Sequence, residues 1–282
     1  MHAKTLIDKD LTVEKYYDKT RFDYRWVWNS RNTFAVHFGY YDAHATHHVA
    51  AVANLNRVLA DWAEVKPNDS ILDAGCGVGG SCLWLAQERG ARVTGISIVE
   101  SQLKDARANI EKHNLTHKIQ FQKADYSKTP FPDASFEVIW AIESQCHADN
   151  KAAFYREAFR LLKNGGRLVM ADYTRSARPL SIEAEKRLSD WLINWAIPDL
   201  DTVEEHKKIA ETTGFQNFTT QLVDKNVERS LRNAYEHSVK WLPMAKFLNR
   251  LGIVSKTQVG NAFGTINQFE AWQSRDWSYT LF

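Results

Sequence analysis

The chain lacks several features that would place it in particular protein classes. Its 282 residues hold only three cysteines, Cys76, Cys82 and Cys146, and no CxxC pair, which argues against a disulfide framework, a zinc ribbon or a dithiol redox motif. No apolar run approaches the roughly 18 residues of a membrane span. The first residues, MHAKTLIDKDLTVEKYYDKT, lack the apolar centre of a signal peptide. We therefore expect a cytoplasmic protein without a membrane span.

The chain also lacks an excess of charge of either sign. Its net charge is +2, from 36 basic and 34 acidic residues that are interspersed along the sequence, so no nucleic-acid partner is expected. Aromatic residues are abundant, at 12% of the chain, and either fill a core or line a pocket for a small-molecule substrate. The sequence leaves the oligomeric state open, including a homo-oligomer.

Short apolar segments alternate with amphipathic ones between about residues 69 and 174. Strands are expected at 70–74, 91–96, 119–124, 136–142 and 167–173. Helices are expected at 80–88, 101–114 and 151–162, the last one ended by KNGG at 163–166. This alternation predicts an α/β protein with a doubly wound parallel sheet.

The flanking sequences suggest three regions. Residues 1–66 look helical and aromatic and are predicted to form an N-terminal lid. Residues 67–175 form the predicted cofactor-binding core. Residues 176–282 supply the remaining strands, near 218–223 and at 277–281, with a helical insert that caps the substrate.

A glycine-rich loop, DAGCGVGG at 73–80, joins the first expected strand to the first helix. Gly75, Gly77 and Gly79 would allow the backbone to approach a ligand closely at a helix N-terminus. The spacing of Gly75, Gly77 and Gly80 also satisfies the dinucleotide pattern GxGxxG, but the second strand ends in Ser97 rather than in the acid of an NAD enzyme.

Two acidic residues favour a different ligand. Asp73 would repel a pyrophosphate but could meet an ammonium group. Asp125, followed by Tyr126 after the third strand, could accept a hydrogen bond from an adenine amino group. Together they fit S-adenosylmethionine.

Three segments in this order, ILDAGCGVGGS, KADYSKTPFPDASFEVIW and LLKNGGRL, resemble the motifs of class I S-adenosylmethionine-dependent methyltransferases. The resemblance implies a Rossmann-like, seven-stranded sheet whose last strand is antiparallel. AIESQCHA, GISIVESQ and the aromatic segment KYYDKTRFDYRWVWNSRNTFAVHFGYYD resemble sterol 24-C-methyltransferases, tocopherol methyltransferases and bacterial isoprenoid C-methyltransferases. That resemblance implies that Ser97 and Gln102 contact the ribose and that Tyr17 contacts the cofactor.

The stretch AIESQCHADN at 141–150 places an acid, a thiol and an imidazole at the end of a buried strand. The carboxyl ends of parallel strands face the ligand crevice, so Glu143 is our candidate for a general base or for the anchor of a substrate hydroxyl. The alternative is that Glu143 caps a loop or pairs with an arginine. His147 is a candidate second base or a loop-shaping residue, and Cys146 is expected to pack in the core.

The N-terminal aromatic residues Tyr24, Trp26, Tyr40 and Tyr41 are candidates for acceptor binding, or else for simple packing. The histidines at positions 44, 47 and 48 lack a second set of ligands, so no metal site is predicted. The predicted function is an S-adenosylmethionine-dependent methyltransferase of natural-product type that methylates a carbon of an isoprenoid or sterol-like alkene. Oxygen or nitrogen methylation is the alternative. An NAD-dependent oxidoreductase or a non-catalytic cofactor-binding protein also stays open.

Overall fold

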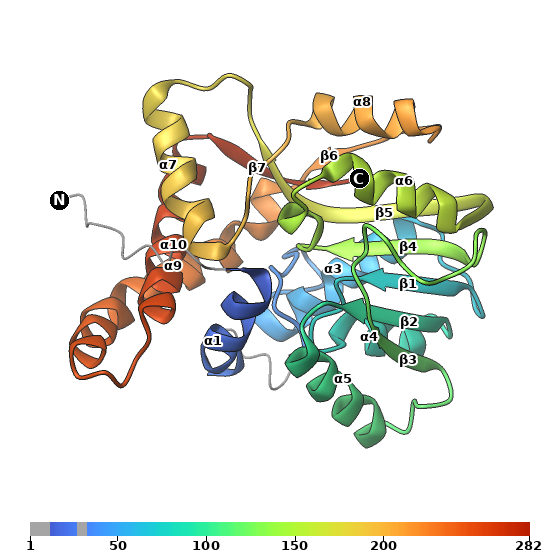
Figure 1. Ribbon diagram of the computed structural model, residues 1–282, viewed down its shortest axis with the longest axis horizontal. Helices are drawn as coiled ribbons and strands as arrows, with labels where there is room; N and C mark the ends of the chain where they lie inside the picture. The colour runs from blue at the N-terminus through green and yellow to red at the C-terminus, as the bar shows by residue number, and fades with distance from the viewer. Residues whose placement is uncertain (1–11, 27–32) are drawn as a thin grey trace.

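A computed structural model describes residues 12–26 and 33–282, without the side chains of 22–26. Its seven strands form one sheet in the order β3-β2-β1-β4-β5-β7-β6 (Figure 1). The strands are β1 (Ser70–Ala74), β2 (Arg92–Ser97), β3 (Ile119–Lys123), β4 (Phe136–Ile142), β5 (Leu162–Arg175), β6 (Gln221–Leu222) and β7 (Trp277–Leu281). β1 to β5 are parallel, and β7 runs antiparallel to both β5 and β6. The predicted seven-stranded sheet with an antiparallel last strand is confirmed.

Helices cover both faces of this sheet (Figure 1). They are α1 (Val13–Trp26), α3 (His48–Trp62), α4 (Gly80–Glu88), α5 (Glu100–Lys112), α6 (Lys151–Leu161), α7 (Ile182–Leu192), α8 (Val203–Thr213), α9 (Asp224–Arg250) and α10 (Lys256–Gln273), with the short 3-10 helices η1 (Gln145–His147) and η2 (Ile193–Trp195). None of the helices described is both long and apolar enough to cross a membrane.

Alternation along the strands divides the core into two layers. Ile71 and Val138 point to the face packed by α3, α4 and α5, whereas Leu72 and Ile139 point to the face packed by α6 and α8. Successive side chains of a strand lie on opposite faces, so a strand buried on both sides reads as a continuous apolar run. This explains why β1 and β4 were predictable to the residue.

β5 and β6 differ most from the predicted strands. β5 begins at Leu162, directly after α6, rather than at residue 167, because Leu162 pairs with Phe136 across a register shift in β4. The glycines at 165–166 therefore lie inside a long, irregular strand. β6 is reduced to Gln221–Leu222, where 218–223 was expected.

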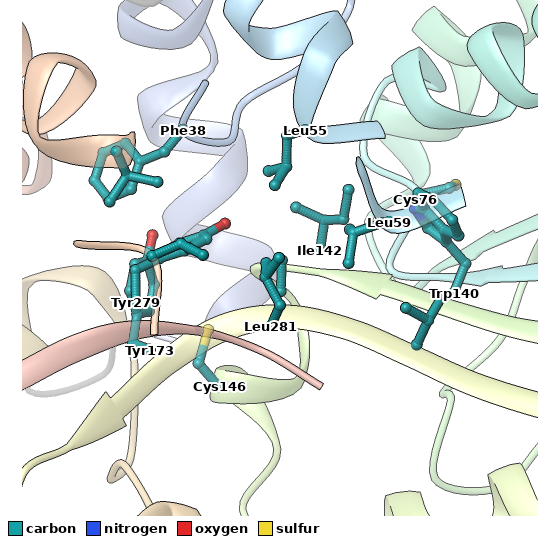
Figure 2. Close-up of a cluster of buried hydrophobic side chains, with 14 of the residues drawn as sticks. Phe38, Leu55, Leu59, Cys76, Trp140, Ile142, Cys146, Tyr173, Tyr279 and Leu281 are labelled. Atoms are coloured by element: carbon teal, nitrogen blue, oxygen red, sulfur yellow. The ribbon is translucent and has the colours of Figure 1, made fainter. Parts of the chain in front are cut away.

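The far end of the sheet packs on an aromatic cluster. Tyr173 of β5 and Tyr279 of β7 are cross-strand partners, with ring centroids 5.7 Å apart. Figure 2 shows both rings beside Phe38, whose ring centroid lies 6.1 Å from that of Tyr173. Cys146 is buried in the same core, which agrees with the packing role expected for it.

Candidate active site

A cavity of about 390 Å³ lies at the carboxyl ends of β1, β2 and β4, where the sheet topology predicts a ligand. It is lined by the glycine loop, by the segments that follow β2, β3 and β4, by α1 and by residues 34–37. The predicted cofactor-binding residues in its lining are Tyr17, Asp73, Gly75, Gly77, Ser97, Gln102, Asp125 and Tyr126, and the predicted catalytic residues in its lining are Glu143 and His147.

The glycine loop needs glycine for two different reasons. Gly75 has a φ of +102°, and a Cβ there would lie 2.4 Å from the Ser144 Cβ, so both backbone strain and contact exclude a side chain. A Cβ on Gly80 would lie 2.2 Å from the Phe34 carbonyl oxygen. Gly80 therefore lets the 34–37 segment close over the loop.

Gly79, which was predicted to bind the cofactor, does not line the cavity. It is the left-handed N-cap of α4, with φ +88° and ψ +15°, and its Cα faces Phe121 and Ala106. Its place in the lining is taken by Gly80, because the turn that begins α4 points Gly79 towards α5.

Asp73 is an almost completely buried carboxylate in the cavity wall. It accepts a hydrogen bond from the Cys82 thiol at 3.1 Å, and no ion pair with a cation involves it among the residues that the structure describes. Burial raises the pKa of Asp73 to about 7, because a carboxylate that is out of water resists ionisation. A bound cation would complete this environment.

Ser97 and Gln102 meet at the end of β2. The Ser97 hydroxyl donates to Gln102 Oε1 at 3.2 Å and accepts from the Val99 backbone N–H at 3.1 Å. Asp125 accepts from the Ser127 backbone N–H at 2.7 Å, and Tyr126 donates its hydroxyl proton to the Ser144 carbonyl. The four side chains thus border one side of the cavity, and their predicted contacts to a ribose and an adenine stay predictions.

Glu143 is held by three hydrogen-bond donors from three parts of the chain. Its Oε1 accepts from the Phe38 backbone N–H and the Tyr279 hydroxyl, both at 2.7 Å, and its Oε2 accepts from the Tyr173 hydroxyl. Burial raises the pKa of Glu143 to about 7, and these hydrogen bonds oppose the rise. Its φ of +47° is uncommon for a side chain with a Cβ and is typical of functional sites.

Hydrogen bonds to the rest of the protein hold the loop that follows Glu143. Ser144 donates to the Ala74 carbonyl at 2.6 Å, and Asp172 accepts from the Cys146 backbone N–H at 2.9 Å. The buried Lys151 ammonium donates to the carbonyls of Cys146 and Ala148. The whole turn is therefore pre-organised, and no arginine side chain that the structure describes pairs with Glu143.

His147 links this loop to α1. Its Nδ1 lies 3.2 Å from the Ala196 carbonyl, which can only accept, so Nδ1 carries the proton. Nε2 then accepts from the Tyr17 hydroxyl at 3.1 Å. Burial lowers the pKa of His147 to about 4, so the ring is neutral and its lone pair is engaged by Tyr17. This geometry favours a positioning role over a second base.

His37 also lines the cavity, although the sequence did not indicate it as a site residue. Its Nδ1–H donates to the Phe38 carbonyl at 2.8 Å, and its buried Nε2 has no partner among the described residues. Burial lowers the pKa of His37 to about 4, so Nε2 is an acceptor at neutral pH. The aromatic run HFGYY gave no signal that the histidine, rather than a tyrosine, faces the site.

The predicted acceptor-binding aromatics do not gather at the cavity. Tyr40 lies against α3, where Asn54 donates to its carbonyl, and Tyr41 lies under the Arg229 guanidinium of α9. Neither lines the cavity, because residues 38–41 turn away from it to join α3. Tyr24 and Trp26 belong to α1, but their side chains lie outside the described residues.

No group of three metal-ligating side chains occurs in the described ranges 12–26 and 33–282. His47, from the histidine-rich stretch, serves instead as the N-cap of α3, accepting from the Ala50 backbone N–H.

Comparison with known proteins identifies the domain. Residues 72–170 match the family model described as "Methyltransferase domain". The chain is 35% identical to 27-O-demethylrifamycin SV methyltransferase of Amycolatopsis mediterranei over 150 residues, 53% of this chain and 55% of that protein. It is 32% identical to 24-methylenesterol C-methyltransferase 2 of Oryza sativa over 209 residues, 72% of this chain and 55% of that protein.

The fold has close structural counterparts. The cyclopropane synthase MmaA2 from Mycobacterium tuberculosis matches with a TM-score of 0.81 and 16% identity, over 97% of this chain and 98% of that one. The chain belongs to the class I S-adenosylmethionine-dependent methyltransferases. It spans about half the length of the two curated relatives described above.

The cofactor of this family is S-adenosylmethionine, and the cavity suits it. Asp73 presents a buried carboxylate that pairs with no cation among the described residues, which fits the ammonium end of the cofactor. Gly75 and Gly80 line the cavity without a side chain. Ser97, Gln102 and Asp125 offer hydrogen-bonding groups for the nucleoside end.

Proposed function

We propose that the protein transfers a methyl group from S-adenosylmethionine to a carbon of a small, mostly apolar acceptor of isoprenoid or sterol type. The observation that supports this is the setting of the Glu143 carboxylate, an acid surrounded by aromatic rings at the junction of two cavities. A second, small cavity measures about 20 Å³ and shares Glu143 with the first. Its lining comprises Tyr16, Tyr17, Val36, Glu143, His147, Tyr173, Trp195 and Ile197.

Carbon methylation of an alkene makes two demands on the protein. The bound cofactor supplies a methyl carbon that its sulfonium already activates. The methylated alkene becomes a cation, which must be stabilised and then lose a proton to a base. The rings of Tyr17, Tyr173 and Trp195 border the second cavity, which we call the recess. An aromatic face in a dry site stabilises a cation by about 0.5–2 kcal/mol. Glu143 is then placed to take the proton.

The hydrogen bonds to Glu143 tune it for this role. Three donors hold the carboxylate in one orientation, which fixes the direction of proton transfer. Burial raises its pKa to about 7, and a base works best when its pKa is near the working pH. The same arrangement would anchor a substrate hydroxyl.

The small recess accommodates only about one water-sized or methyl-sized group. Binding of an isoprenoid-like acceptor therefore requires a lining segment to move aside. α1 is that segment in our proposal, because Tyr16 and Tyr17 border the recess and Tyr17 also borders the larger cavity.

Oxygen methylation is the second candidate, and one observation favours it. A hydroxyl acceptor must lose its proton to a base, and His37, which lines the larger cavity, has a buried Nε2 with no partner among the described residues. The rifamycin relative is named for an O-demethylated substrate, and the sterol relative for C-methylation. Three buried free cysteines support a reducing, cytoplasmic setting for either reaction.

The test is mass spectrometry of an apolar metabolite pool incubated with the protein and deuteriomethyl-labelled S-adenosylmethionine, followed by NMR location of the label. Label on a carbon supports the proposal, and label on oxygen or nitrogen replaces it with the alternative. Bound cofactor without transfer to any component would refute catalysis. Glu143→Gln serves as the inactive control.

A further inference from the structure

The hairpin of α9 and α10 ends in a tip that exposes large apolar side chains. Figure 1 shows this hairpin projecting from the body of the molecule, on the side where α1 lies. Met244, Phe247, Leu251 and Ile253 are 51%, 57%, 57% and 68% exposed. Large apolar side chains gathered in one segment at this exposure usually mark an interaction surface.

These side chains are not needed by the hairpin itself. The hairpin has its own small core, formed by Ala245, Val254, Val259 and Phe263 with Trp241, Leu242 and Leu248 packed against it. Met244, Phe247 and Leu251 follow the helical spacing i, i+3, i+7 and so share one face. That face is exposed, whereas the neighbouring face of α9 is already covered.

The same segment is purely cationic. Between Glu236 and Glu270 the sequence contains no acidic residue, although acidic and basic residues alternate elsewhere. Its cations are Lys240, Lys246, Arg250 and Lys256, and all four are exposed. Within the part of the chain that the structure describes, none forms an ion pair with a carboxylate, and the Lys246 ammonium lies 4.7 Å from the Phe263 ring centroid.

We infer that this tip, residues 239–256, docks on the surface of an anionic lipid bilayer. Apolar side chains can enter the boundary between headgroups and acyl chains, while neighbouring lysine and arginine side chains meet the lipid phosphates. A second copy of this chain fits less well, because joining two such tips would bring eight like charges together. The tip adds no membrane span and lies in the interface.

The docking tip connects to the cavity through α10 and α1. The Tyr16 hydroxyl of α1 donates to Asn261 Oδ1 of α10 at 2.8 Å in a buried contact, and the next residue, Tyr17, lines the cavity. Docking would therefore hold α1, the helix that borders the cavity, close to the membrane surface. The inference rests on the tip alone and does not depend on which atom is methylated.

Co-sedimentation of the full-length chain with vesicles tests this inference. The vesicles contain phosphatidylcholine alone or an equimolar mixture with phosphatidylglycerol. We expect binding to the mixed vesicles that weakens as salt is added, and at least tenfold weaker binding to phosphatidylcholine. Phe247→Ser/Ile253→Ser should weaken binding to the mixed vesicles about tenfold or more, because apolar contact is lost.

A second variant addresses charge. Each cation near an anionic surface strengthens binding roughly fivefold, so Lys240→Glu/Lys256→Glu should weaken binding at least about tenfold. The matched controls are Ile182→Ser/Leu222→Ser, which changes exposed apolar residues elsewhere, and Lys208→Glu/Lys225→Glu, which reverses exposed charges elsewhere. The controls should bind as the native chain does, and every variant should retain affinity for S-adenosylmethionine.

Several outcomes would overturn the inference. These are absence of binding to either kind of vesicle, equal binding to both, or equal losses in tip and control variants. Light scattering that shows a dimer of the native chain, lost in Phe247→Ser/Ile253→Ser, would assign the tip to self-association instead.

Discussion

Asp73 and Glu143 lie in the same cavity wall, and the comparison of their surroundings separates two kinds of buried acid. Burial raises the pKa of both carboxyls to about 7. Asp73 accepts a hydrogen bond from one weak donor, the Cys82 thiol. Glu143 accepts from a backbone N–H and two tyrosine hydroxyls.

The difference shows that the protein itself supplies the hydrogen-bond partners of Glu143 but leaves Asp73 to a partner from a ligand. Glu143 is oriented by the fold, as a group must be when it acts on a reacting atom. Asp73 has one weak donor and no ion pair among the described residues, as expected when its partner is the cation of a ligand. Removing each carboxylate should therefore affect different measurements.

The largest expected effect is on turnover in Glu143→Gln. Loss of the base should lower kcat at least about 100-fold, while the dissociation constant of S-adenosylmethionine stays nearly unchanged. Asp276→Asn is the matched control, because Asp276 is a buried acid that neither lines the cavity nor holds the loop after Glu143. Unchanged turnover in Glu143→Gln would remove Glu143 from the mechanism.

The second effect is on cofactor affinity in Asp73→Asn. Loss of a buried charge partner for the ammonium should raise the dissociation constant about 30-fold or more, measured by calorimetry. Glu143→Gln is the internal comparison, since it should leave this constant alone. If both variants lost affinity equally, the two acids would not have separate roles.

Cofactor affinity should also depend on pH through Asp73. In the free protein the pKa of Asp73 is about 7, and a bound ammonium group favours the ionised form and so lowers it. Binding below that pKa must release a proton, so affinity should fall by up to about tenfold for each pH unit below about 7. Calorimetry in buffers of different ionisation enthalpy would count the proton, and Asp73→Asn should abolish the dependence.

The smallest effect is expected from Tyr17→Phe. The variant loses one hydrogen bond to His147 Nε2, which contributes about 1 kcal/mol, so cofactor affinity should weaken roughly fivefold. Tyr126→Phe, which loses a hydrogen bond to the Ser144 carbonyl in the same cavity, provides the comparison. A loss above about 100-fold for Tyr17→Phe would show that the hydroxyl does more than position His147.

Much of the core was predictable from local patterns. The bounds predicted for 70–74, 80–88, 136–142 and 277–281 agree with β1, α4, β4 and β7, because continuous apolar runs bounded by turn residues have few alternatives. The start of β5 was not predictable, since Leu162 becomes a strand residue only through its pairing with Phe136.

The site divides in the same way. The glycine loop and the acids after the strands could be placed from the sequence, because strand ends of a parallel sheet share one edge. The exception, Gly79, depends on the rotation of a single turn at the start of α4. The turn of Tyr40 and Tyr41 away from the cavity, and the place of His37 in the cavity lining, depend on how α3 packs.

The sequence by itself determined the wound sheet, the cofactor loop and the position of Glu143 at the end of β4, since each follows from residues close together in the chain. Only the tertiary structure decided what surrounds that acid: Phe38, Tyr173 and Tyr279 come from three distant segments. The physical reason is that a buried carboxylate must find its donors across the packed core, and packing between distant segments leaves no periodic trace in the sequence.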